Sequence, residues 1–300
     1  MEINDGFLIL DKNKNCTSHD CVKSIRKILN IKKVGHTGTL DPQVTGVLPI
    51  AIGSATRFIQ YLPQEKRYLG IIKLGIRTHT DDIHGEVLSK KPIPKISYYE
   101  LDHNLNFFRG NFKQIPPKVS SVHINGVRAY QKSWRKEDFV LPSKEVRVDK
   151  LILKEWVQEE GKLSIEITCS SGTYIRSIAR DLGLLLKSEG CLYYLRRIEA
   201  SGFKEDKSVD LNKLISEKNN INEIISPITH ALNHLSRIIL KSDKDILYWQ
   251  TGRKIAMESE NLIINQKYLV LDQKNTLLGI GINHCEEINY LQPKLVLNAK

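Results

Sequence analysis

The stretch Val34–Ile50, which reads VGHTGTLDPQVTGVLPI, carries the strongest structural signal in this chain. Its loop from Gly35 to Gly46 is rich in Gly, Thr and Pro, so the backbone can make turns that most side chains forbid. The apolar run over 47–52 that follows predicts a buried strand. Asp41 therefore stands on a tight, glycine-bounded loop framed by rigid structure. An isolated Asp-Pro pair is typical of an Asx turn, whereas this setting favours a displayed, functional carboxylate.

Short strands and helices are expected on both sides of this loop. Thr17 followed by Asp20 is a start signal for a helix over 17–30. Ser54 is expected to cap a helix over 55–62. A further helix over 174–187 and strands over 6–10, 68–74 and 163–169 follow from the spacing of the apolar residues. Because the helices interrupt the strands irregularly, the sequence predicts an α+β fold and not a regular parallel βαβ array.

The end of the chain differs in pattern from the rest. Between 206 and 233 the sequence is polar and helical in character, and after Ser236 short strands begin again. We therefore predict a domain over 1–233 and a small β-barrel-like module over 234–300. The basic turn Thr251–Lys254 in this module either faces a nucleic acid or is an ordinary exposed turn.

Composition narrows the possible partners and excludes several classes of protein. The formal net charge of +11 and a pI near 9.3 favour a polyanion, with nucleic acid first, although a basic chain can also be merely soluble. The five cysteines show neither paired nor zinc-ligand spacing, which predicts no metal site and a reduced, cytoplasmic protein. No apolar run approaches the ~18 residues of a membrane helix, and no signal peptide is expected.

Several motifs resemble those of the bacterial TruB family, the tRNA pseudouridine-55 synthases. The stretch at 34–50 is the longest match, and Asp11-Lys12 and the segment 114–117 agree as well. The other matching segments are Lys66-Arg67-Tyr68, Leu74-Gly75, Thr78-His79-Thr80-Asp81, Ser171-Gly172-Thr173-Tyr174-Ile175-Arg176, Asp181-Leu182-Gly183 and Tyr194-Leu195-Arg196-Arg197. The resemblance spans roughly the first 230 residues. The tail is similar to a PUA domain in its position and strand pattern.

This resemblance implies a fold and a reaction. The fold is a pseudouridine synthase catalytic domain, whose central mixed, largely antiparallel sheet is flanked by helices, followed by a PUA-like RNA-binding domain. The reaction turns uridine into pseudouridine in the T-loop of tRNA, at position 55, after base flipping and without a guide RNA. It breaks the C1′–N1 bond, rotates the bound base and joins C1′ to C5. No cofactor is expected, because no redox or energy source is needed.

The resemblance also implies roles for individual residues. Asp41 acts as the nucleophile, by attack on C1′ or on C6, or assists glycal formation. Arg176 pairs with this carboxylate and keeps it charged. Tyr68 stacks on the flipped base and moves a proton. Among the remaining substrate-binding residues, His36 enters the RNA loop, and Tyr174 and Leu195 line the base pocket. Lys12, Arg196 and Arg197 meet phosphates, although Arg197 can equally be structural.

Some segments depart from the family pattern. Asn13–Cys16 stands where the family usually has a proline and then a glycine, so a looser first loop is expected. Val119–His123 and Ser133-Trp134-Arg135 also differ, the latter in place of a usual Ala-Arg pair. We expect the RNA contacts of this segment to be rewired.

Two other functions fit parts of the pattern. An RNA-guided synthase of the Cbf5/dyskerin kind shares the Asp motif but works inside a ribonucleoprotein. A noncatalytic tRNA-binding or tRNA-folding protein would need the basic surface alone. The resemblance favours the stand-alone enzyme, acting as a monomer on the T-arm stem-loop of tRNA, with no obligate protein partner and no membrane association.

Overall fold

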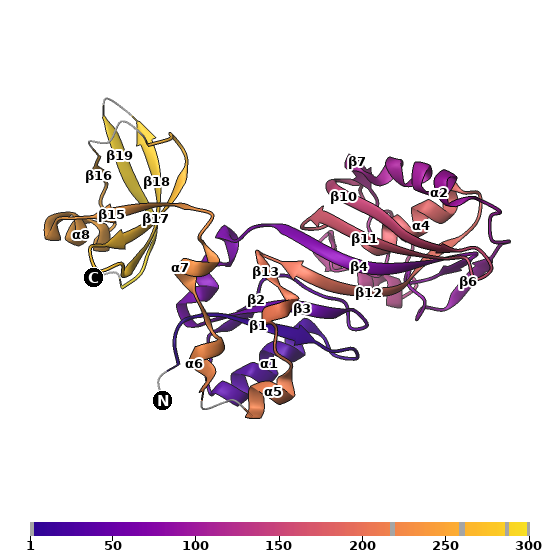
Figure 1. Ribbon diagram of the computed structural model, residues 1–300, viewed down its shortest axis with the longest axis horizontal. Helices are drawn as coiled ribbons and strands as arrows, with labels where there is room; N and C mark the ends of the chain where they lie inside the picture. Colours follow the sequence, from indigo (N-terminus) through magenta and orange to yellow (C-terminus); the bar gives the residue numbers. More distant parts are fainter. Residues whose placement is uncertain (1–2, 217–219, 258–261, 286–287, 299–300) are drawn as a thin grey trace.

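A computed structural model describes residues 3–216, 220–257, 262–285 and 288–298, and Figure 1 shows its two sheets. Within these residues the larger sheet has ten strands, and its main path runs β14-β1-β3-β12-β4-β11-β10-β7. β2 pairs with β3 and β13 with β12. The strand bounds are β1 Gly6–Lys12, β2 Val34–His36, β3 Thr45–Ile52, β4 Glu65–Leu74, β7 Gly110–Gln114, β10 Lys144–Val157, β11 Lys162–Ser170, β12 Gly190–Ala200, β13 Phe203–Lys204 and β14 Ser226–Pro227.

The pairing in this sheet is antiparallel except between β12 and β3, which run parallel. The predicted mixed, largely antiparallel sheet is therefore confirmed. The helices that accompany it are α1 Ser18–Leu29, α2 Tyr98–Leu105, α3 Ala129–Trp134, α4 Ile175–Leu185, α5 Leu211–Ser216, α6 Ile221–Ile224 and α7 Ile228–Ala231, with 3-10 turns η1 Gly53–Tyr61, η2 Asn106–Phe108 and η3 Glu205–Lys207. Two hairpins complete this part of the chain, β5 Ile76–Thr78 with β6 Val87–Lys90 and β8 His123–Ile124 with β9 Val127–Arg128.

Helix α1 shows how local sequence sets the structure. Thr17 is its N-cap, and the Thr17 and Asp20 side chains each bond to the other's backbone amide, which is the capping box predicted from the sequence. Cys16 and Cys21 lie on either side of this box with their sulfur atoms 3.8 Å apart, at the positions of a hydrophobic staple. The entry of α1, which follows the first loop of the chain, is thereby fixed.

The expected helix after Ser54 is wrong in type and in cap. The segment is the 3-10 turn η1, its N-cap is Ile52, and no side chain caps it. Gly53 has φ +62°, so the chain turns sharply at the end of β3 and η1 begins one residue before Ser54. The Thr56 hydroxyl donates to the Gly53 carbonyl instead.

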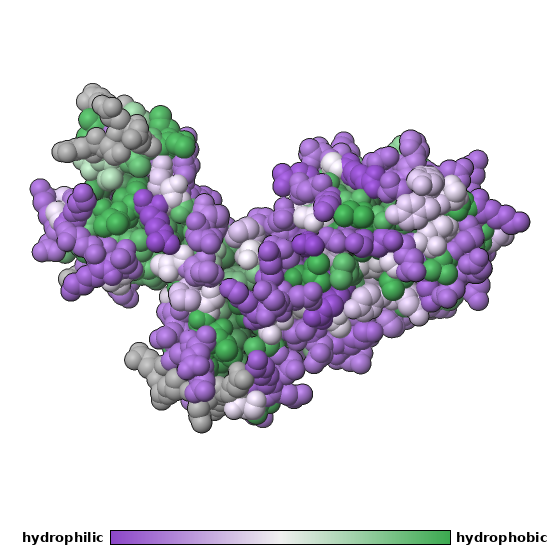
Figure 2. Space-filling model, viewed as in Figure 1, coloured by the Kyte–Doolittle hydropathy of each residue, from purple (hydrophilic) through white to green (hydrophobic). Residues whose placement is uncertain are grey.

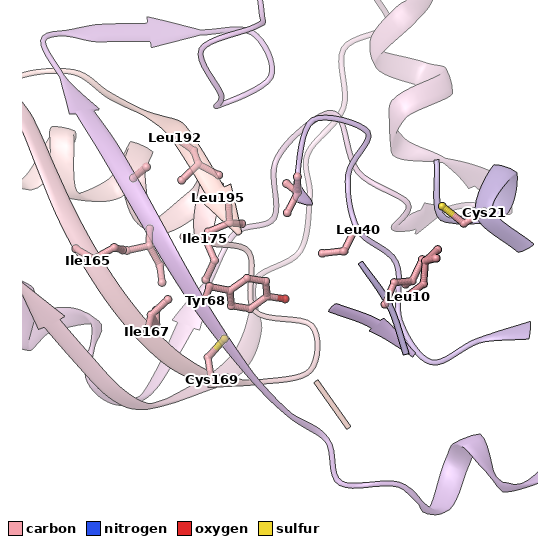
Figure 3. Packing of buried hydrophobic residues seen from close by; sticks show 14 of the residues in the cluster. Leu10, Cys21, Leu40, Tyr68, Ile165, Ile167, Cys169, Ile175, Leu192 and Leu195 are labelled. Atoms are coloured by element: carbon pink, nitrogen blue, oxygen red, sulfur yellow. The ribbon is translucent and has the colours of Figure 1, made fainter. Parts of the chain in front are cut away.

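Alternation along the strands places an apolar core on each face of the sheet. In β1, Leu8 and Leu10 belong to the larger core, whereas Phe7 and Ile9 belong to the second. Figure 3 shows part of the larger core, in which Tyr68, Leu195 and Ile175 gather between the strands and the loop that carries Leu40.

The second sheet follows in order β15-β17-β18-β19-β16, with β15 Ser236–Leu240, β16 Ile255–Ala256, β17 Lys267–Asp272, β18 Leu277–Cys285 and β19 Asn289–Val296, and with helix α8 Asp243–Gln250 beside it. The short strands predicted after Ser236 are confirmed. Pairing along the described residues gives an open path from β15 to β16, so the sheet is not a closed barrel. Leu269, Ile280 and Leu295 of this sheet share the second core with Phe7 of the larger sheet and Phe58 of η1.

The two sheets give the molecule an uneven outline. In Figure 2 a hollow lies between the C-terminal sheet and the far end of the larger sheet. Hydrophilic side chains cover most of the larger sheet in this view, and apolar side chains gather on the C-terminal sheet. No helix among the described residues is long and apolar enough to cross a membrane.

Candidate active site

Buried polar side chains hold the loop that carries Asp41, residues 37–46, which we call the Asp41 loop. The ammonium group of Lys12 donates to the carbonyls of Asn13, Cys16 and Pro42. The Ser18 hydroxyl both donates to the carbonyl of Leu40 and accepts from its amide, at 3.2 and 2.9 Å. Because a loop inside a protein must satisfy its own backbone groups, these side chains replace the hydrogen bonds of regular structure. They fix the backbone on both sides of Asp41.

Arg197 of β12 holds the other side of the Asp41 loop. Its fully buried guanidinium donates to the carbonyls of Val47, Gly38 and Thr39. Gly46 has φ +104° and packs so closely on Arg197 that a Cβ atom there would lie 2.1 Å from the Arg197 carbonyl oxygen. A glycine is therefore required at this contact. The close approach allows β3 and β12 to pair in parallel at Thr45 and Gly46.

Arg176 is the side chain that meets Asp41. One terminal nitrogen, Nη2, lies 2.9 Å from Asp41 Oδ2, and Nη1 donates to the carbonyls of Thr80 and Val119. The guanidinium is buried, whereas 44% of the Asp41 side chain is exposed. The guanidinium thus joins the Asp41 loop to two other segments, and the carboxylate keeps a free approach from solvent.

The start of helix α4 orients Arg176. No side chain of the helix itself caps it, but the buried Gln114 accepts from the Tyr174 amide and donates to the Tyr174 carbonyl. The Ser177 hydroxyl donates to the Ile115 carbonyl. One turn further on, Arg180 pairs with the buried Asp81 at 2.9 Å. The segment around Gln114 therefore supplies the cap that the helix lacks.

Asp41 and Arg176 line a cavity of about 320 Å³, within the range of small-ligand sites. Leu195 is the third predicted residue on its wall. The complete lining is Lys14, Asp41, Pro42, Gln43, Val44, Thr80, Asp82, His84, Val119, Trp134, Arg176, Leu192, Tyr193, Tyr194 and Leu195. Two carboxylates, one guanidinium and several aromatic rings thus line one space.

Four other predicted residues are not part of this lining: Lys12, His36, Tyr68 and Tyr174. Tyr68 is 7% exposed and lies in the larger core, where burial raises the pKa of its hydroxyl. In Figure 3 its ring lies near Leu195 and its hydroxyl is turned to the side of Leu40. Burial also raises the pKa of the half-buried Tyr174. Both phenols therefore hold their protons at neutral pH.

His36 lies on β2, beside the Asp41 loop, and the structure gives it no partner there. Its Nδ1 atom is buried and has no hydrogen-bond partner among the described residues. Burial, aided by the positive charge of Arg197, lowers the pKa of the imidazole. The ring is therefore neutral near pH 7, and a neutral imidazole leaves water at a lower cost than a charged one.

Lys12 corrects the sequence-based prediction of a phosphate contact. It is fully buried, and its three donors are used by backbone carbonyls of this chain. A phosphate in solution has no access to it, so Lys12 is structural. The same holds for Arg197. Its neighbour Arg196 forms a two-bond ion pair with Asp11 and a further contact with Glu205.

Two lysines near the Asp41 loop have no carboxylate within salt-bridge distance among the described residues. Lys66 approaches Gly38, and burial, with the neighbouring Arg197 charge, lowers its pKa to about 8. Lys144 lies 5.0 Å from the centre of the Tyr174 ring, and burial lowers its pKa. Sequence reasoning assigned no role to these lysines, because nothing in their spacing shows that they lie beside the loop.

Other residues of the site were also missed. Thr80 and Val119 bind Arg176 through backbone carbonyls, which no side-chain pattern reveals. Trp134 lines the cavity, and the signal that could have found it is its place in a segment that departs from the family pattern. Among the described residues, no group of three or more His, Cys, Asp or Glu side chains is arranged to hold a metal ion.

Comparison with known proteins shows which family this chain belongs to. Residues 26–175 match the model described as TruB family pseudouridylate synthase, N terminal domain. A protein of Prochlorococcus marinus (strain MIT 9301) named tRNA pseudouridine synthase B is 58% identical over all of both chains. One of the same name from Synechococcus sp. (strain CC9311) is 44% identical over 98% of both chains.

Solved structures agree on the fold. The crystal structure of a Cbf5-Nop10-Gar1 complex contains a chain with a TM-score of 0.75 at 24% identity, covering 97% of this chain and 84% of that one. A structure of an H/ACA RNP bound to a substrate RNA gives a TM-score of 0.73 at 23% identity, with the same coverage. The family match and the named relatives make this chain a pseudouridylate synthase, which is an isomerase. The chain is a member of the TruB family of pseudouridylate synthases.

Proposed function

We propose that this protein isomerises uridine to pseudouridine in the T-loop of tRNA, at position 55, without a guide RNA. The observation that carries the proposal is the Asp41–Arg176 pair on the wall of an open cavity, in a chain that matches tRNA pseudouridine synthases B along its whole length. The enzyme class and the tRNA substrate follow from those relatives. The base position and independence from a guide RNA follow from the motif resemblance.

Asp41 is the proposed nucleophile. Attack on C1′, attack on C6 and assistance to glycal formation all require an ionised carboxylate that can reach the nucleotide. The buried guanidinium of Arg176 balances the negative charge of the carboxylate when substrate excludes water. The carboxylate is partly exposed, so it can reach the nucleotide. The fork of Arg176 also orients the carboxylate, since its other nitrogen is held by two carbonyls.

The neighbouring residues suit the handling of a flipped base. Leu195 offers an apolar wall inside the cavity. Tyr68 lies in the same buried cluster as Leu195, so a small displacement of that wall would expose its ring for stacking. Its protonated hydroxyl can then donate or relay a proton as C1′ joins C5. We assign Tyr174 to the pocket edge and the neutral His36 to the space that the extruded base leaves in the RNA.

We also propose that residues 234–300 form a PUA-like RNA-binding domain beside a catalytic domain of residues 1–233. Support comes from basic side chains around one aromatic ring, because Lys244 lies 5.6 Å and Arg253 5.4 Å from the centre of Tyr248. Arg253 belongs to the basic turn singled out in the sequence. Such a surface attracts phosphates and offers a ring for base contact. Monomeric action in the cytoplasm completes the proposal.

The experiment that tests this function uses purified protein and a bare, unmodified T-arm stem-loop. Wild-type protein should form pseudouridine at the position equivalent to 55 with no guide RNA and no other protein. Asp41→Asn, which keeps size and removes the charge, should lower kcat by at least about 1000-fold, since it removes the reacting group. Its dissociation constant for the stem-loop should stay close to that of the wild type. Modified uridines are mapped by sequencing.

Each alternative function gives a different result in this experiment. A guide-dependent synthase would bind the stem-loop without modifying it. A noncatalytic binding or folding protein would behave identically as wild type and as Asp41→Asn. Modification of a uridine elsewhere in the loop would keep the reaction and overturn the position.

A further inference from the structure

Trp134 occupies an unusual place for a tryptophan. It is the last residue of helix α3 and lines the same cavity as Asp41 and Arg176. Its exposed fraction is 70%. The structure describes all three tryptophans of the chain, and the other two donate their indole N–H to backbone carbonyls, Trp156 to Ile96 and the buried Trp249 to Leu278. No acceptor for the Trp134 indole lies among the described residues.

The position of Trp134 is fixed although its ring is exposed. The preceding residue, Ser133, is buried, and its hydroxyl lies 2.8 Å from His79 Nε2 in the turn that also supplies the Thr80 carbonyl to Arg176. The Tyr130 ring meets the indole edge to face, with 4.9 Å between ring centres. A large ring held in one place in advance loses little entropy when a ligand binds.

The other aromatic residues of the cavity extend this surface. Tyr193 and Tyr194 of β12 line it with Trp134, and the Lys14 ammonium lies 5.7 Å from the centre of the Tyr194 ring. Exposed aromatic faces beside cations are how proteins bind unstacked bases and their phosphates. An apolar protein partner fits less well, because a carboxylate and a guanidinium occupy the same cavity.

We propose that Trp134 is a stacking platform for a base of the RNA loop beside the extruded uridine. The proposal rests on the function proposed above and names a substrate contact of that same cavity. Trp134 stands in the segment that differs from the family pattern, where an Ala-Arg pair is usual.

The test combines binding, turnover and tryptophan fluorescence with the full chain and the unmodified T-arm stem-loop. Stem-loop binding should quench the fluorescence of the wild type and leave that of Trp134→Phe unchanged, since Trp249 is fully buried and Trp156 is packed against the larger core, outside the cavity lining. Trp134→Ala should raise the dissociation constant and lower kcat/KM by about ten- to a hundredfold, the range found when a stacking ring is removed. Trp134→Phe should recover most of this loss, and Tyr99→Ala, which removes an exposed ring on α2, should change nothing.

A double-substitution cycle identifies the stacked nucleotide. Stem-loops that lack one base at a time are titrated with wild type and Trp134→Ala. Where the missing base is the one that stacks, Trp134→Ala causes no further loss, whereas at other positions the two losses add. Failure of the wild type to form pseudouridine would overturn the proposed function, but binding and fluorescence would still report on stacking. Unquenched fluorescence, an unchanged dissociation constant for Trp134→Ala, or losses that add at every position would each overturn the stacking proposal.

Discussion

The Asp41 loop and the segment 119–135 both border the cavity, yet they are held in different ways. Buried Lys12, Ser18 and Arg197 bind the backbone of the Asp41 loop from three sides. The segment 119–135 is tied to the walls of the cavity by the Val119 carbonyl and the Ser133 hydroxyl, and it contains its own β8–β9 hairpin. Lys132 and Arg135 pair with Glu137, just beyond its end. Its large side chain Trp134 faces solvent.

This difference matches the roles proposed for the two regions, catalysis for the Asp41 loop and RNA contact for the segment 119–135. A reacting carboxylate must be held within a fraction of an ångström, which backbone anchoring by buried side chains provides. A surface that meets RNA can change with its substrate, provided its few anchors remain. The sequence follows the same division, because the Asp41 loop matches the family pattern closely and the segment 119–135 departs from it.

Arg176 bonds both regions, and its replacement by lysine should have the largest effect on activity. Lysine keeps the positive charge, but one ammonium group cannot meet Asp41 and also the carbonyls of Thr80 and Val119 in the same directions. We expect kcat to fall by about 100-fold while tRNA affinity changes little. Single-turnover kinetics and filter binding measure the two quantities. Arg109→Lys, whose fork bonds Asp102 and the Leu151 carbonyl outside the cavity lining, is the control, and equal losses of affinity and kcat in Arg176→Lys would contradict the prediction.

Lys12→Met tests whether the Asp41 loop is more firmly anchored than the segment 119–135, through the free energy of unfolding. Methionine keeps most of the apolar stem but leaves three loop carbonyls without their donor. We expect the free energy of unfolding to fall by about 3 kcal/mol, against about 1 kcal/mol for Ser133→Ala, the matched change in the segment 119–135. Urea unfolding measures both. Similar losses in the two variants would mean that the loop is no more firmly anchored than the segment.

The smallest expected effect is a pH dependence caused by Lys66. Its pKa is about 8 in the folded protein, against 10.5 for an ordinary lysine. Between these values the unfolded chain holds a proton that the folded chain has lost, so the free energy of unfolding should rise with pH across this window. Lys66→Gln should remove this contribution. Unfolding curves for both proteins across the window provide the test, and a parallel rise in the variant would assign the effect to other groups.

Local signals explain how much of the fold the sequence predicted. The Thr17–Asp20 capping box, the strand over 47–52 and the alternating strand at 163–169 are decided by neighbouring residues, and all three are confirmed. The segment after Ser54 was wrong because apolar spacing over nine residues does not separate a 3-10 turn from an α-helix, and the turn at Gly53 displaced the expected cap.

The site shows where sequence reasoning stops. Asp41 and Arg176 were named from motifs, and the structure brings them together. Lys12 was assigned to a phosphate contact from the motif resemblance, which does not show how deeply a side chain is buried. One of its three carbonyl partners, Pro42, lies 30 residues away and carries no side-chain signature. The cavity could not be predicted from the sequence either, because its walls come from loops, α3, α4 and β12, which only tertiary packing brings together.

The apolar cluster shared by the two sheets has a mechanical consequence. Leu269, Ile280 and Leu295 of the C-terminal sheet are packed in one cluster with Phe7 of the larger sheet and Phe58 of η1, so a rotation of one sheet against the other would expose this shared core. The distance between the Asp41 cavity and the surface formed by Tyr248, Lys244 and Arg253 is then held constant. If both surfaces bind RNA as proposed, we expect an RNA whose dimensions match this separation to bind best.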